Sequence, residues 1–144
     1  MDAFDSDALI YAVIPGHALG RRVRALFSMA PSGELVGTGS MLLLPEVLAK
    51  PVRDEQFEQE NDLKALLARL ELPPMSMATA NLATTAAAKY SLQAADAVHL
   101  ASALEAGADR FITNNQRAFP RTIEEIDVVY PADLPDPDEA PDPG

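Results

Sequence analysis

Residues 93–113 read QAADAVHLASALEAGADRFIT, and this stretch predicts a helix that leads directly into a strand. The helix is expected over residues 93–106, and its apolar stripe at helical spacing consists of Ala94, Ala97, Val98, Ala101 and Leu104. Gly107 is a typical helix stop. The strand is expected over residues 109–113 and runs into the polar loop Asn114-Asn115-Gln116.

The same alternation extends in both directions along the chain. Strands are expected at residues 2–5, 35–39, 75–77 and 127–130, and helices at residues 7–13, 16–29, 54–70 and 79–90. A further helix is expected around Glu46, with Pro45 in its first turn and its end before Pro51. Helical crossovers between strands make neighbouring strands parallel. The sequence therefore predicts an α/β domain with a short parallel sheet of four or five strands.

Composition excludes several classes of protein. The 144 residues contain no cysteine, so disulfides and thiolate metal sites are excluded. No apolar run approaches the ~20 residues of a membrane span, and we expect a soluble, cytoplasmic protein that does not act at a membrane. The formal net charge is −11, and residues 131–144 hold five of the acidic residues with five prolines. We expect the folded domain over 1–130 and a disordered acidic tail over 131–144.

Three acidic residues stand out by their positions. Asp5 follows the first expected strand, whereas Glu46 and Asp96 are each embedded in an apolar helical segment. A carboxylate beside an apolar stripe is costly unless hydrogen bonds, an arginine or a metal ion compensate it. One interpretation is a shared site for Mg²⁺ or Mn²⁺, which hard oxygen ligands suit. The other is three independent acids: a turn residue, a solvent-facing glutamate and an aspartate favoured by a helix dipole.

Further polar residues lie where the ends of parallel strands would bring them to the same edge. Ser6 and Thr113 carry hydroxyls that could hold a carboxylate or phosphate oxygen, or could only cap the chain locally. His99 shares a helix face with Asp96 and is either a substrate contact or a structural residue. The basic residues of the expected second helix face solvent, phosphates or an acidic partner, and these are Arg21, Arg22 and Arg24.

Three blocks of the sequence together resemble the PIN domain, and specifically the VapC-type toxins of toxin–antitoxin pairs. The blocks are FDSDALIYAV near the start, LLLPEVLAKP in the second quarter and LQAADAVHLASALEAGADRFITNN in the third, and the resemblance spans about residues 3–119. The third block is the most specific, because it carries DA-x-HLA and the later GAD and TN at full spacing.

The resemblance implies a three-layer α/β/α fold and a catalytic set of three acids, Asp5, Glu46 and Asp96, of which Asp5 and Asp96 bind metal. A fourth acid usually follows Thr-Asn in this family, and here that position is Asn115. An amide oxygen can still face a cation but adds no charge. Asp7 lies close enough to Asp5 to supply an extra carboxylate. Asn114 and the residues named above, Ser6, Thr113 and His99, would support the site.

The implied activity is Mg²⁺-dependent endonucleolytic hydrolysis of RNA, with Mn²⁺ as the other candidate ion. The implied partners are an RNA substrate, a cognate antitoxin protein and a second copy of the chain. Two alternatives remain open at this point. A degenerate PIN module would bind an antitoxin or RNA without cutting, as Asn115 suggests. A haloacid-dehalogenase-like phosphatase would use Asp5 and Asp7, although no lysine follows Lys89 in the chain.

Overall fold

A computed structural model describes residues 1–139 and contains one five-stranded sheet. Its strands are β1 (Asp2–Phe4), β2 (Gly37–Thr38), β3 (Leu70–Glu71), β4 (Arg110–Ile112) and β5 (Asp127–Val129). They lie in the order β3-β2-β1-β4-β5, and every neighbouring pair is parallel. The predicted parallel sheet is therefore confirmed, with β1 at its centre.

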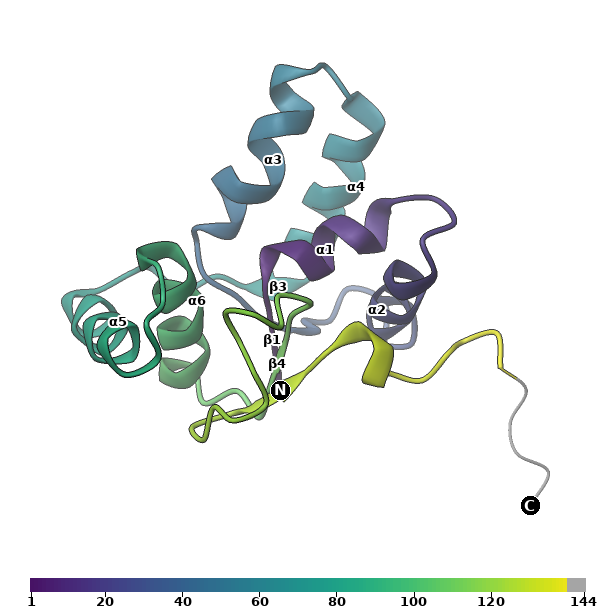
Figure 1. Ribbon diagram of the computed structural model, residues 1–144. Helices are drawn as coiled ribbons and strands as arrows, with labels where there is room; N and C mark the ends of the chain where they lie inside the picture. Colours follow the sequence, from purple (N-terminus) through teal and green to yellow (C-terminus); the bar gives the residue numbers. More distant parts are fainter. Residues whose placement is uncertain (140–144) are drawn as a thin grey trace.

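The strands bury both faces of the sheet, because successive side chains point to opposite sides. Phe4 and Ile112 enter the core on one face, while Ala3 and Phe111 enter the core on the other. The first face packs on α1 and α2, and the second on α5 and α6 (Figure 1). These helices span Ser6–Val13 (α1), Ala18–Ser28 (α2), Met77–Tyr90 (α5) and Ala94–Glu105 (α6). The result is the expected three-layer α/β/α arrangement.

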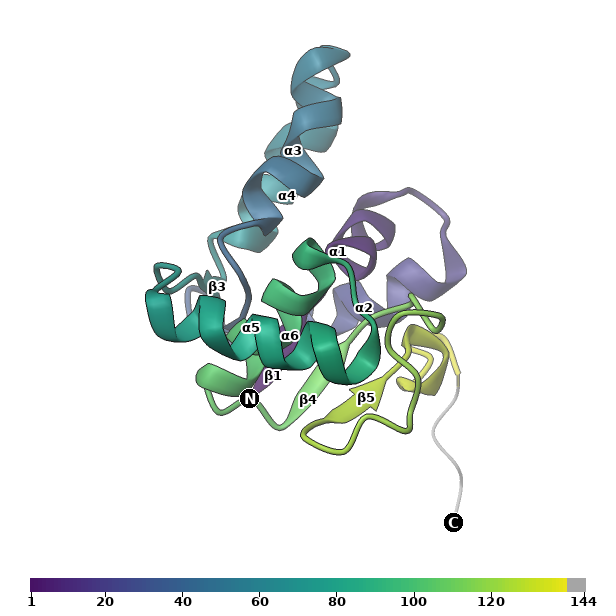
Figure 2. The same ribbon diagram turned by 60° about the vertical axis from the view of Figure 1, so that its left-hand side comes forward.

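A helical hairpin extends beyond the sheet and consists of α3 (Leu43–Arg53) and α4 (Phe57–Leu67) (Figure 2). The expected end before Pro51 is wrong, because α3 continues through this proline to Arg53. A proline removes one backbone donor and crowds the preceding turn. So close to the end of α3 that cost is small, and Gln56 N then bonds the Pro51 carbonyl at 2.8 Å.

The strand expected at residues 75–77 is also wrong. β3 instead lies at Leu70–Glu71, because the helix expected to reach residue 70 already ends at Leu67. Ser76 caps α5, since its hydroxyl accepts from Thr79 N at 3.2 Å and Thr79 Oγ1 accepts from Ser76 N at 3.1 Å. This reciprocal capping satisfies two backbone donors and begins a helix where a strand was expected.

Within residues 1–139, no helix combines the length and the apolar character that crossing a bilayer requires.

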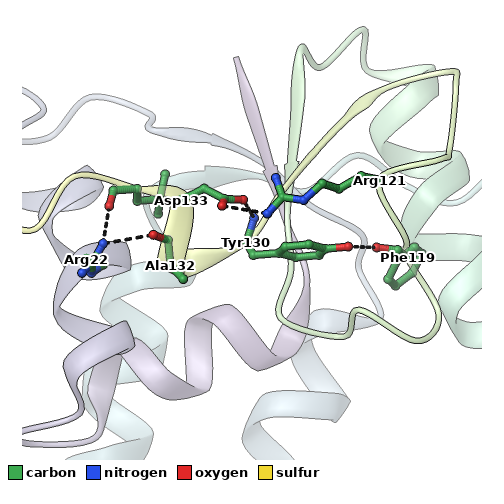
Figure 3. A network of polar contacts seen from close by, with 7 residues as sticks. Arg22, Phe119, Arg121, Tyr130, Ala132 and Asp133 are labelled. Carbon is green, nitrogen blue, oxygen red and sulfur yellow. Dashed lines mark hydrogen bonds and ion pairs between the residues drawn. The ribbon is translucent and has the colours of Figure 1, made fainter.

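The acidic C-terminal segment packs on the domain as far as the structure describes it, contrary to the expectation of disorder from residue 131. Residues Pro131–Asp133 form a 3₁₀ helix, and Leu134 is only 2% exposed within the core that holds Phe4. Arg22 Nη1 donates to the carbonyls of Ala132 and Leu134 at 3.1 and 2.8 Å (Figure 3). The expected disorder of residues 140–144 lies outside the described residues.

Side-chain charges reinforce this attachment. Asp133, Asp136 and Asp138 each meet a different arginine. Their partners are Arg121 at 2.8 Å, Arg22 at 3.7 Å and Arg21, respectively. All three pairs are partly exposed, so each contributes little by itself. The sequence pattern failed here because composition registers the prolines and acids but not the single leucine that anchors them.

The buried position of Leu134 predicts that the segment stabilises the domain. Leu134→Ala should lower the free energy of unfolding by about 2–4 kcal/mol, because it leaves a cavity in the core. Leu35→Ala is the matched control, since Leu35 is 60% exposed and its loss should change stability by less than about 0.5 kcal/mol. Urea denaturation measures both values. Equal transition midpoints for the two variants would contradict the packing of this segment.

Candidate active site

Asp5 occupies the junction between β1 and α1, at the centre of the carboxyl edge of the sheet. The side chain caps α1, since its Oδ1 accepts from Ser6 N at 2.8 Å. Its Oδ2 accepts from the Thr113 hydroxyl at 2.7 Å, directly after β4. The residue is only 4% exposed. Two donors, the backbone N–H of Ser6 at the start of α1 and the Thr113 hydroxyl directly after β4, thus fix the orientation of this carboxylate.

Asp7 lies two residues further along α1 and is tied to the same loop. Both of its carboxylate oxygens accept from Asn114 N, at 3.2 and 3.1 Å. Burial, and after it the neighbouring charge of Asp5, raise the pKa of Asp7 to about 6. The backbone N–H of Asn114 opposes this shift by stabilising the charged form. Asp7 therefore belongs to the acidic site electrostatically.

Asp96 approaches from the opposite face of the sheet, in the first turn of α6. Partial burial raises its pKa, and the charges of Asp5 and Glu46 act in the same direction. The imidazole of His99 opposes the shift. Asp5, Asp7 and Asp96 thus repel one another across the carboxyl edge of the sheet. The interpretation that Asp5, Glu46 and Asp96 share one cation stays a prediction.

Glu46 is directed at His99 in the structure. His99 Nε2 bonds Glu46 Oε1, and since an ionised carboxylate only accepts, the imidazole nitrogen is the donor. The imidazole is buried, and its Nδ1 has no hydrogen-bond partner within the described residues. His99 therefore contacts the acidic site through Glu46.

Asn115, which stands at the position of the family's fourth acid, has a local structural contact. Its Oδ1 accepts from Ala118 N at 3.2 Å and so closes the turn after β4. Its backbone N–H donates to the Thr113 hydroxyl at 3.1 Å, which links it to the Asp5 contact. The side chain also lines a cleft together with Asp96. The amide thus serves the loop and faces the acidic site.

The charge of this site is not neutralised by the protein. Among residues 1–139, no lysine or arginine forms an ion pair with Asp5, Asp7 or Asp96. As the side chains stand, no three His, Asp or Glu residues in this part of the chain are grouped closely enough to hold an ion. The donors nonetheless fit a hard divalent cation, because they are oxygen atoms whose mutual repulsion such an ion would relieve.

Three residues that lie beside the acids were not predicted from the sequence. Arg117, Gln93 and Tyr90 line the cleft that also contains Asp96 and Asn115. The one available signal was the position of Arg117, a cation two residues after the Thr-Asn-Asn run. Tyr90 and Gln93 end and begin helices on the far face of the sheet, and no spacing rule connects them with the loop after β4.

The raised pKa of Asp7 predicts a dependence of stability on pH. Between about pH 4 and 6 the folded protein holds a proton that the unfolded chain has already lost, so stability falls as pH rises through this window. Asp7→Asn removes this loss and should gain on the order of 2–3 kcal/mol over the parent at pH 7, but little at pH 4. Urea denaturation across this range measures the difference.

The exposed Asp62 of α4 provides the control, and Asp62→Asn should keep the pH dependence of the parent. A constant stability difference between Asp7→Asn and the parent from pH 4 to 7 would show that burial and Asp5 do not destabilise the charged form.

A solved structure described as a toxin–antitoxin complex from Klebsiella pneumoniae is similar, with a TM-score of 0.68 and 21% sequence identity. The similarity covers 91% of this chain and 98% of that chain, which shows a shared fold. No curated protein sequence gives a significant match. The PIN domain family matches residues 3–125. This match includes Asp5, Glu46, Asp96 and Asn115, and the chain therefore belongs to the PIN domain family.

Proposed function

We propose that this protein is a metal-dependent endoribonuclease and acts as the toxin of a toxin–antitoxin pair, as VapC-type proteins do. The observation that carries the proposal is the group of uncompensated carboxylates, Asp5, Asp7 and Asp96, at the carboxyl edge of the sheet. Membership of the PIN family supports nuclease chemistry. The similar fold in a toxin–antitoxin complex supports the biological role.

Each side chain of the acidic site has its own role in the proposed reaction. Asp5 and Asp96 hold the ion, for which Mg²⁺ is our first choice and Mn²⁺ the second. Such an ion lowers the pKa of a bound water and offsets charge on the scissile phosphate. The Thr113 hydroxyl donates to one oxygen of Asp5. This hydrogen bond fixes the orientation of the carboxylate and of its remaining lone pairs. Glu46 completes the catalytic set, and His99 positions its carboxylate.

The partners follow from the same proposal. An antitoxin would hold the nuclease inactive, and a second copy of the chain would form a homodimer. RNA as the substrate places the activity in the cytoplasm. No membrane takes part in this function.

One alternative function has specific support. A PIN module that binds an antitoxin or RNA with little or no cleavage would need no complete acidic set. Asn115 adds no charge, and Glu46 is engaged by His99. The phosphatase alternative depended on the pair Asp5 and Asp7 with Thr113 as a further hydroxyl, and membership of the PIN family leaves it without support.

Asp96→Asn tests the nuclease directly. The variant should cleave single-stranded RNA at least about 100-fold more slowly in Mg²⁺, since a ligand and its charge are lost. Its melting temperature should equal or exceed that of the parent, because a destabilised carboxylate has been removed. Gel-based cleavage assays and thermal melts measure the two effects. Asp62→Asn is the control on an exposed helix face and should cleave at the parental rate.

Cleavage retained by Asp96→Asn would overturn the catalytic assignment. If the parent protein bound RNA but left it intact in both Mg²⁺ and Mn²⁺, the non-cleaving PIN module would be the correct alternative.

Asn115→Asp tests whether a fourth charge strengthens metal binding. The new carboxylate can keep the hydrogen bond from Ala118 N, so the loop should persist. Without metal the variant should be less stable than the parent, because it adds a charge to an acidic site. With metal the melting temperature should rise more than it does for the parent. A tenfold gain in affinity would be worth about 1.4 kcal/mol, or on the order of 3–5 °C.

Thermal melts with EDTA, Mg²⁺ and Mn²⁺ compare the two proteins. Equal metal-induced shifts would mean that Asn115 only closes the loop after β4.

A further inference from the structure

An open cleft of about 570 Å³ adjoins the acidic site on the α5–α6 side of the sheet. It lies between the end of α5, the start of α6 and the loop after β4, and its lining residues include Asp96, Asn115, Arg117, Gln93 and Tyr90. Its volume is within the range of small-molecule binding sites. Because two residues of the candidate active site form part of its wall, a ligand here would be continuous with a substrate there.

Arg117 supplies the positive charge in the lining of this cleft. Most lysines and arginines of the chain contact a carboxylate or a backbone carbonyl, including Arg22, Arg69 and Arg110. Within residues 1–139, Arg117 makes no such contact, although it is exposed in a strongly acidic protein. Its guanidinium is therefore free for an anionic ligand.

Two neutral groups complete the wall around this cation. Gln93 precedes α6, and its side chain makes no capping hydrogen bond, so its amide is available to a ligand. The Tyr90 hydroxyl donates to Glu125 at 2.6 Å, which holds the aromatic ring at the edge of the cleft. A fixed aromatic ring and a free amide are the groups that bind an unstacked base or its ribose in RNA-binding proteins.

We propose that this cleft is the subsite for a nucleotide next to the cleaved phosphodiester, with Arg117 binding that nucleotide's phosphate. The inference rests on the proposed ribonuclease function and specifies how its substrate is held. A continuous site that contains both carboxylates and an unpaired arginine suits a polyanionic substrate. Only one phosphodiester of such a substrate is cleaved, and its neighbouring phosphates only need to be bound. The acids serve the scissile phosphate through a metal ion, and Arg117 serves a neighbouring phosphate directly.

Arg117→Gln tests the phosphate contact. The probe is a fluorescent single-stranded RNA, and its cleavage in Mg²⁺ is measured at several KCl concentrations. KM should rise about 3- to 10-fold with kcat nearly unchanged, because the contact binds substrate and transition state equally. The slope of log(kcat/KM) against log[KCl] should become shallower by about 0.7, the value for one phosphate contact on a single strand.

Three further variants separate charge from structure. Arg117→Lys should restore the parental salt slope. Gln93→Ala should raise KM without changing that slope, since it removes no charge. Arg24→Gln is the matched control, because Arg24 is an exposed arginine on α2 that also lacks a partner within the described residues. It should retain the parental KM and slope.

Binding of the same RNA in EDTA, measured by fluorescence anisotropy, tests the subsite independently of catalysis. If the parent cuts RNA but Arg117→Gln and Arg24→Gln have the same KM and salt slope, the subsite is wrong and the nuclease stands. If the parent does not cut RNA, the nuclease is wrong, and the subsite stands only if Arg117→Gln alone weakens binding and its salt dependence. An equal salt dependence of binding in the two variants overturns it.

Discussion

The hydrogen bond between Thr113 and Asp5 joins the two central strands of the sheet at the point where both end. It depends on parallel pairing, since only parallel strands bring the residue after β1 beside the residue after β4. It is also formed in a buried place, where a carboxylate without donors would be strongly destabilised. The remaining acids are arranged around this fixed carboxylate by α1, α6 and the loop after β4.

The domain carries an energetic cost at this edge of the sheet. Burial and mutual repulsion raise the pKa of Asp7 and of Asp96, so their ionised forms destabilise the fold. Sites that bring like charges together in this way are commonly functional. A ligand of opposite charge binds favourably there, because it relieves the repulsion that destabilises the site without the ligand. The surrounding layers offset the cost with two apolar cores, one on each face of the sheet.

Much of this arrangement could be predicted from local sequence, and the failures have physical causes. The helix and strand around Asp96 were predictable because their apolar periodicity and the glycine stop agree. The predicted helix end before Pro51 was wrong because a helix tolerates proline near its end. The strand at Leu70 was not predicted because a strand of two residues has no periodicity of its own. Strand order is also the basis for expecting polar residues at the ends of neighbouring parallel strands to share one edge of the sheet. The hydrogen bond from His99 to Glu46 depends on packing between distant helices and had no local signal.

The packing of Leu134 has a consequence for how the chain folds as it leaves the ribosome. The core that contains most of the N-terminal elements, including Phe4 and Phe27, is also the one that Leu134 closes. A nascent chain that has completed β5 but not this leucine leaves an apolar opening beside α2, and the Arg22 guanidinium still lacks its two carbonyl acceptors. Native packing of the earliest elements is thus deferred until residue 134 has emerged, and the order of synthesis opposes the order in which the core can close.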